Sequence, residues 1–144
     1  MTVRDVRMEE VEAMVALEEE LVGIRRQQDF RFFIENAQGI WHGSVVEGAE
    51  GLDGFLFSVD DPGSRIAGPG VMRSTDAALS LIAAEAGRFD GGSPLLLVPA
   101  AETELVGALY AAGARNCELH VAQVRGEAQA FGGIVMPTFM PETG

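Results

Sequence analysis

Hydrophobic positions along the chain follow two periods, and each period predicts a different kind of element. Apolar residues recur at helical spacing in four stretches, near 8–22, 30–37, 75–89 and 102–112. Shorter apolar runs typical of strands lie around them, at 3–6, 40–47, 52–59, 65–68, 95–98, 117–124 and 131–139. The resulting order, βααβββαβαββ, predicts an α/β fold with an α+β mixed sheet, because a meander of strands precedes a βαβ crossover.

Three of these patterns carry more specific expectations. Phe55, Phe57 and Val59 alternate with other residues, so one face of their strand should meet the core. Leu95–Val98 has no alternation, which predicts a central strand covered on both faces. The first helix carries a run of glutamates opposite its apolar face, and we expect that run to be solvated. Its members are Glu9, Glu10, Glu12, Glu18, Glu19 and Glu20.

Composition fits one globular domain over residues 1–144. A chain of 144 residues can bury an ordinary core, and 47% hydrophobic content is too high for disorder. No apolar stretch approaches a membrane span, and the first residues lack the pattern of a secretory signal, so we expect a cytoplasmic protein. Cys117 is the only cysteine, which excludes an internal disulfide framework, and we expect it to pack as a small hydrophobe.

Charge narrows the range of partners. The formal net charge is −12, and all ten basic residues are arginines. Nucleic acids and anionic lipids bind clustered basic residues, so the charge excludes nucleic-acid binding and disfavours a membrane surface. It favours a cationic partner, such as a small-molecule amine.

Two short segments resemble a known family. Leu52-Asp53-Gly54-Phe55-Leu56 resembles the third strand of the GNAT superfamily of N-acetyltransferases, and Leu105–Ala114, with Ala-Leu-Tyr-Ala-Ala-Gly, resembles its fourth helix. With Ile66–Gly70 leading into a helix, the stretch 52–125 is most similar to the divergent second domain of tandem GNAT proteins. The resemblance implies a GNAT-like acyl-CoA N-acyltransferase fold, with acetyl-CoA as the co-substrate.

The resemblance also implies a place for the cofactor. In this family the CoA pyrophosphate binds backbone N–H groups between the fourth strand and the third helix. The candidate cofactor-binding residues here are Gly68, Gly70, Val71, Met72, Arg73, Ser74 and Thr75. Pro69 has no N–H to donate, and Asp76 places a carboxylate in the first helical turn. The alternative is a Gly-Pro-Gly turn followed by an ordinary helix cap.

Catalytic candidates come from the later elements. Tyr110 is the candidate general acid, although the family's tyrosine would fall at Leu109, so Tyr110 is alternatively a structural residue. Glu118 and His120 lie two apart on one predicted strand, where they form either an acid/base pair or an exposed pair on a sheet edge.

The remaining candidates are fewer and less specific. Glu47 and His42 are further candidate bases. Trp41 and His42 are also candidate substrate-binding residues, although an amphipathic strand produces such a pair by chance. With two histidines and one cysteine, the sequence offers no zinc site.

The apolar run Gly133–Pro141 needs cover from water. We expect it to pack on a partner subunit, as in a homodimer, or to cover the cleft between the fourth and fifth strands. Two functions remain open. The first is transfer of an acetyl group from acetyl-CoA to the amine of a small cationic acceptor. The second is a catalytically inactive GNAT-like module for ligand binding or dimerisation.

Overall fold

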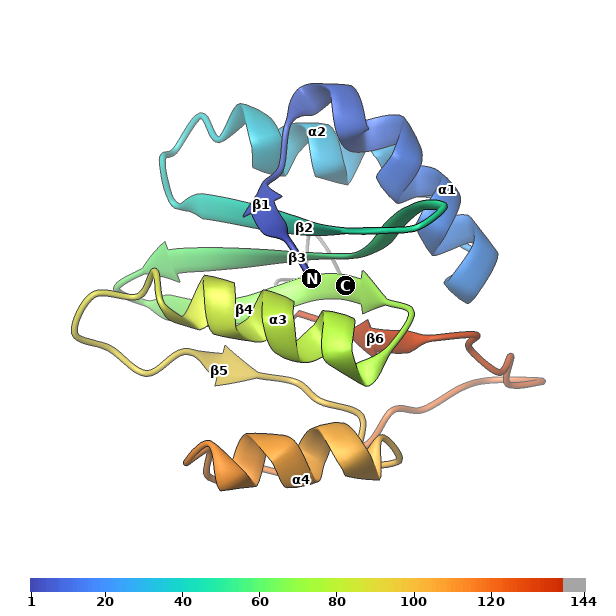
Figure 1. Cartoon of the computed structure of the whole chain (residues 1–144). Coiled ribbons are helices and arrows are strands. Elements are labelled where there is room, and N and C mark those ends of the chain that lie inside the picture. The colour runs from blue at the N-terminus through green and yellow to red at the C-terminus, as the bar shows by residue number, and fades with distance from the viewer. Residues whose placement is uncertain (139–144) are drawn as a thin grey trace.

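The computed structural model describes residues 1–138, which form six strands and four α-helices in one mixed α/β fold (Figure 1). The strands are β1 (Val3–Asp5), β2 (Trp41–Gly48), β3 (Gly51–Asp61), β4 (Ser64–Met72), β5 (Leu95–Leu96) and β6 (Ile134–Met136). The helices are α1 (Val11–Val22), α2 (Gln27–Glu35), α3 (Thr75–Ala86) and α4 (Thr103–Ala111), with a 3-10 turn, η1, at Met8–Glu10. The expected order is confirmed as far as α4, and in residues 112–138 one strand follows α4 instead of two.

The sheet is divided at β4. Strands β1 to β4 form an antiparallel series, and β5 is parallel to β4, with Ile66 opposite Leu95. A bulge then interrupts β4, because Gly68 and Pro69 together face a single residue of β3. Beyond the bulge, β6 pairs antiparallel with the same edge of β4, over residues 70–72. The edge of β4 is therefore shared between two strands, one before the bulge and one after it.

Helices cover both faces of the sheet. Residues alternate along β3, so Phe55, Phe57 and Val59 pack against α1 and α2, as expected, and Leu56 packs against α3. An aromatic cluster fills the first face, with ring centroids 5.0 Å apart for Phe30 and Phe55. Figure 1 shows α3 in front of the sheet, α1 and α2 over its other face, and α4 beyond β5.

Two glutamates of the α-helices are buried, and each accepts hydrogen bonds from other side chains. Glu85 of α3 is fully buried, and its carboxylate accepts hydrogen bonds from the hydroxyls of Ser44 and Ser58. Arg88 Nε lies 3.3 Å from the same carboxylate. On the opposite face Glu18 is 1% exposed and accepts a bond of 3.0 Å from Arg26 Nε.

The expectation of a fully solvated acidic run is thus wrong for two of its members. Glu18 is paired with Arg26 inside the structure, and Glu10 is 9% exposed and paired with Arg4. Burial is tolerated because each carboxylate has an arginine partner.

The region after α4 differs most from the sequence-based expectations. Residues 117–124 form no strand, and every residue from 111 to 132 is exposed, Cys117 among them. The last strand is limited to Ile134–Met136, whereas 131–139 was expected. Residue 139 of that strand, and residues 139–141 of the apolar run, lie outside the described part of the chain. Strand β5 is two residues long and lies at the sheet edge, with Leu95 44% exposed. The expectation of a central strand at Leu95–Val98 is therefore wrong, because no strand of the described residues pairs with β5 on the side away from β4.

We predict that Glu85→Ala lowers the free energy of unfolding by about 2–4 kcal/mol, because it leaves two buried hydroxyls without their acceptor and Arg88 without a nearby buried opposite charge. Chemical denaturation measures the change. Glu104→Ala, which removes an exposed glutamate from α4, is the control and should change stability by less than about 0.5 kcal/mol. Equal effects of the two substitutions would contradict the role given to Glu85.

Candidate functional site

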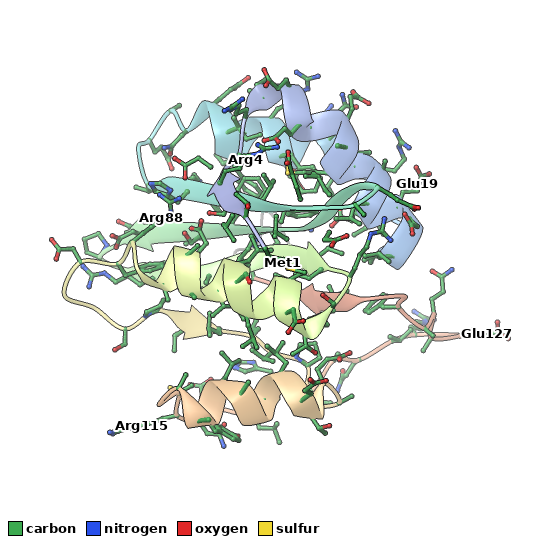
Figure 2. The ribbon with its side chains drawn as sticks, in the orientation of Figure 1. Met1, Arg4, Glu19, Arg88, Arg115 and Glu127 are labelled. Atoms are coloured by element: carbon green, nitrogen blue, oxygen red, sulfur yellow. The ribbon has the colours of Figure 1, made fainter. Side chains whose placement is uncertain are left out.

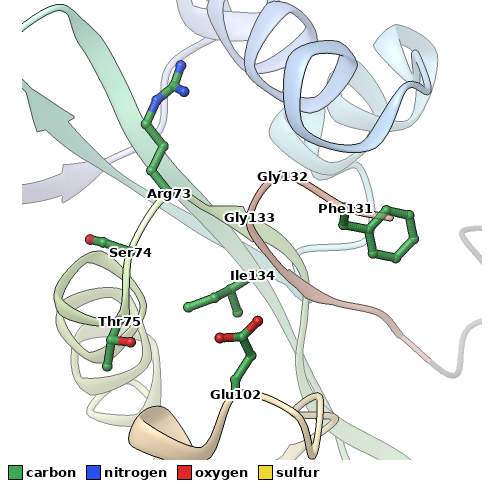
Figure 3. A pocket seen from close by; sticks show the side chains of 8 residues that line it. All are labelled: Arg73, Ser74, Thr75, Glu102, Phe131, Gly132, Gly133 and Ile134. Atoms are coloured by element: carbon green, nitrogen blue, oxygen red, sulfur yellow. The ribbon is translucent and has the colours of Figure 1, made fainter. Parts of the chain in front are cut away.

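A hollow of about 290 Å³ opens where β4 meets α3, and we call it the α3 hollow (Figure 3). Three segments line it: the β4–α3 junction, the residue before α4, and the chain leading into β6. Its lining residues are Arg73, Ser74, Thr75, Glu102, Phe131, Gly132, Gly133 and Ile134. Three of the seven candidate cofactor-binding residues, Arg73, Ser74 and Thr75, therefore lie at one hollow.

Ser74 fixes the start of α3. Its backbone is extended, and its Oγ accepts a hydrogen bond of 3.2 Å from the N–H of Ala77. Asp76 lies in the first turn, where a carboxylate interacts favourably with the helix dipole. This is the ordinary helix cap that the sequence allowed as the alternative to a phosphate site.

Arg73, the cation nearest the cap, is bound to a carboxylate of α1. Its Nη1 and Nη2 lie 2.6 and 2.7 Å from the two carboxylate oxygens of Glu20. These bonds lower the pKa of Glu20 and raise that of Arg73. In Figure 3 the Arg73 side chain points away from Ser74 and Thr75. Its charge is therefore matched by a protein carboxylate before any ligand arrives.

Glu102 forms no ion pair within the described residues, so it gives the α3 hollow a negative charge that no cation of those residues matches. It precedes α4 and faces the hollow across from Thr75 (Figure 3). With Arg73 paired to Glu20, the lining presents two hydroxyls, one carboxylate and the backbone of two glycines. Such a lining suits a neutral or cationic polar group better than a pyrophosphate.

The other four cofactor candidates lie in β4. Their positions in the sheet account for the residue type found at each of them. Val71 and Met72 are fully buried in the two cores. A Cβ at Gly68 would lie 2.4 Å from the carbonyl oxygen of Pro137, and one at Gly70 would lie 2.8 Å from that of Phe55. Neighbouring backbone therefore requires these glycines, without any ligand.

The catalytic candidates lie away from the α3 hollow. Tyr110 is 48% exposed, and its hydroxyl bonds Asn116 Oδ1 at 2.8 Å. Leu109, the position expected for the tyrosine, packs against the core beside α3. Glu118 and His120 contact one another at 2.9 Å, but both are exposed and neither lies on a strand.

The substrate candidates are also separated. Trp41 is buried, with its ring 4.1 Å from that of Phe33, and His42 is exposed on β2. Consecutive strand residues point to opposite faces, so these two side chains do not share a pocket. Glu47 pairs with Arg4 beside a second hollow, of about 260 Å³. None of the catalytic or substrate candidates lines the α3 hollow.

Sequence reasoning missed several residues of the site. Glu102, Phe131, Gly132 and Gly133 come from the chain around α4 and β6, which had been given no role at the helix start. The Gly132-Gly133 pair was an available signal, because paired glycines mark close approach of backbone. A Cβ at Gly133 would lie 2.5 Å from the carbonyl oxygen of Met72.

No protein-family model, curated protein or solved structure matches this chain. Within residues 1–138, no helix is long and apolar enough to cross a membrane.

We predict that Arg73→Gln raises the pKa of Glu20 back toward its ordinary value, because the substitution removes the hydrogen bonds that lower it. In the native chain this pair stabilises the fold above the unfolded pKa of Glu20 and stops doing so as the pH falls through the lower folded pKa. Carboxyl NMR titration measures the shift. Arg31→Gln, which removes an exposed arginine of α2, is the charge-matched control. An unchanged titration of Glu20 in Arg73→Gln would refute the assignment.

A second prediction concerns β6. Met136→Ala should lower the free energy of unfolding by about 2–5 kcal/mol, because Met136 is fully buried against β4 and α3. The matched control is Met8→Ala at a position that is 37% exposed, and its effect should be much smaller. Thermal and chemical unfolding compare the two, and similar losses would show that β6 does not dock on β4 in solution.

Proposed function

We propose that this chain is a GNAT-like domain that does not transfer acyl groups and that acts as a ligand-binding or dimerisation module. The observation that carries the proposal is the pairing of β6 with β4 over residues 70–72, directly before the loop at the start of α3. That pairing occupies the strand edge that an acyl-CoA would need.

Whether an acyl-CoA can bind depends on this edge of β4, because CoA is long and carries amide groups. A pyrophosphate at the start of α3 leaves a long arm whose amide groups need hydrogen-bond partners when buried. The adjacent partners are the N–H and C=O groups of Gly70–Met72, and these already pair with Ile134–Met136. Displacing β6 would expose Ile134 and Met136, at about 1.5–3 kcal/mol for each side chain.

Charge supports the same conclusion. A pyrophosphate at the α3 hollow would meet the Glu102 carboxylate, an arginine already bound to Glu20, and a chain of net charge −12. These features oppose an anion and favour a small neutral or cationic polar ligand in the hollow.

Acyl transfer also needs an acid or base within reach of the reacting atoms. Tyr110, Glu118 and His120 are exposed and do not line the α3 hollow, and Trp41 is committed to the core. A module without catalysis needs none of these groups near the hollow.

A second candidate function is transfer of an acetyl group from acetyl-CoA to the amine of a small cationic acceptor. The observation in its favour is the α3 hollow itself, where the hydroxyls of Ser74 and Thr75 lie at a helix N-terminus, opposite a carboxylate that suits an amine. On this hypothesis β6 would have to leave β4 before the cofactor could bind.

We predict that millimolar acetyl-CoA leaves the melting temperature unchanged, because the β4 edge is already occupied. A ligand at one hundred times its Kd would add about 2.7 kcal/mol, which is readily seen in thermal unfolding. Free-thiol release with a panel of amines should likewise stay at the rate without protein, and a GNAT acetyltransferase of established activity serves as the positive control. A melting shift together with amine-dependent thiol release would replace our proposal with the second candidate.

A further inference from the structure

We propose that the α3 hollow binds a small primary alkylammonium ion, held by the carboxylate of Glu102 and the hydroxyl of Thr75. This inference rests on the ligand-binding role proposed above and names the chemical class of the ligand. The ligand carries one positive charge and a short hydrocarbon chain, and its binding requires neither CoA nor transfer of a group.

The carboxylate of Glu102 is available to a ligand. Glu102 comes directly before α4, yet its side chain makes no capping hydrogen bond with that helix. The residue is half-buried, and within residues 1–138 it forms no ion pair. Residues 139–144 contain no basic residue that could supply one. A half-buried carboxylate without a cation gains free energy when a cation enters the hollow beside it.

Thr75 provides a second hydrogen-bond acceptor on the opposite wall. In Figure 3 its hydroxyl points toward the side of the hollow where Glu102 lies, and the Glu102 carboxylate points toward Ile134. The Thr75 side chain makes no hydrogen bond within the described residues, whereas the Ser74 hydroxyl already accepts the N–H of Ala77. A primary ammonium has three N–H donors, enough for a carboxylate and a hydroxyl together.

The arginines near the hollow leave the charge of Glu102 in place. Arg73 lines the hollow, but its guanidinium binds both carboxylate oxygens of Glu20. Arg115 follows α4, and Figure 2 shows it at the end of that helix away from Glu102. A helix of nine residues is about 13 Å long, so Arg115 does not reach the carboxylate.

The helix dipoles are compatible with this arrangement. The start of α4 favours a negative charge at Glu102. The start of α3 by itself would repel a cation, but the Asp76 carboxylate in its first turn offsets that effect. The charge that remains for a ligand to match is therefore that of Glu102.

Volume limits the ligand to a small molecule. Small-molecule sites begin at roughly 300 Å³, and the α3 hollow, at about 290 Å³, is at the bottom of that range. Phe131 and Ile134 are its apolar lining residues, so a short hydrocarbon chain also finds contacts there. The space therefore suits an amine of a few heavy atoms.

Other cations fit less well. A metal ion such as Mg²⁺ or Ca²⁺ needs several oxygen ligands, and Glu102 is the only carboxylate among the described lining residues. All ten basic residues of the chain are arginines, so no side chain of a second copy can supply a primary ammonium. The ion is thus a separate small molecule.

Titration of the full chain with propylammonium chloride, followed by amide NMR, tests the proposal. The amide signals of Thr75 and Ile134 should shift and saturate at millimolar ligand. At equal ionic strength, neither 1-propanol, which has a similar shape without the charge, nor tetramethylammonium, which has the charge without N–H donors, should saturate them. An equal response to either compound, or no saturable response to propylammonium, would overturn the proposal.

Substitutions test the two groups that hold the ion. Glu102→Gln should weaken binding at least about tenfold, because it removes a charge-assisted hydrogen bond. Thr75→Val keeps the shape and removes the hydroxyl, so it should weaken binding about two- to tenfold. Glu104→Gln removes an exposed charge of α4 outside the hollow and should leave the affinity unchanged.

Unchanged melting without ligand shows that each variant has folded. Full affinity in Glu102→Gln or in Thr75→Val would overturn the proposal, and so would an equal loss in Glu104→Gln.

The amine titration is independent of the test of acyl transfer, because it contains no CoA. Failure of propylammonium to bind would remove this ligand class and leave the proposed absence of acyl transfer standing. Thiol release on addition of acetyl-CoA and propylammonium together would instead overturn the proposed function, even where the amine binds as expected.

Discussion

The bulge at Gly68–Pro69 is the constraint on which the rest of the structure depends. Two residues of β4 stand opposite one of β3, so the outer edge of β4 changes direction at this point. Strand β5 pairs with the part before the bulge and β6 with the part after it. Gly68 must be glycine because the Pro137 carbonyl approaches it so closely. The bulge thereby decides what can reach the start of α3, because the chain that leads into β6 forms one wall of the α3 hollow.

Carboxylates inside the fold connect helices to particular partner residues on both faces of the sheet. Glu85 joins α3 to β2 and β3, while Glu18 and Arg26 join α1 to the chain that enters α2. Glu20 joins α1 to the end of β4 through Arg73. Much of the negative charge of α1 therefore serves internal pairing. Each pair removes one arginine together with one carboxylate, so the unpaired groups still carry the whole net charge of −12.

Periodicity was enough to predict the elements up to α4, because each of them carries its own pattern and its own termination signal. The alternation of Phe55, Phe57 and Val59 gave the core face correctly. Glu18 and Glu85 could not be predicted as buried, since their burial depends on partners eight or more residues away in the sequence. The pattern at 117–124 indicated a strand, but a strand also needs a neighbour, and no local pattern specifies where that neighbour lies.

The candidate site was predictable only in part. Arg73, Ser74 and Thr75 were named because the family resemblance implied a cofactor site between the fourth strand and the third helix. Glu102, Phe131 and Gly132 come from other elements and became neighbours only through the position of β6. Gly68 and Gly70 were expected to bind a cofactor, and in the structure the backbone of the same chain approaches both of them.

The late position of β6 also affects how the molecule is made. Its three residues pair with residues about sixty positions earlier, which is a contact of high sequence separation and slow loop closure. During synthesis β4 emerges long before β6, so its outer edge stays unsatisfied while α3 and α4 are translated. A nascent chain stalled in this interval exposes an adhesive strand edge, and chaperone dependence or co-translational aggregation would be greatest there.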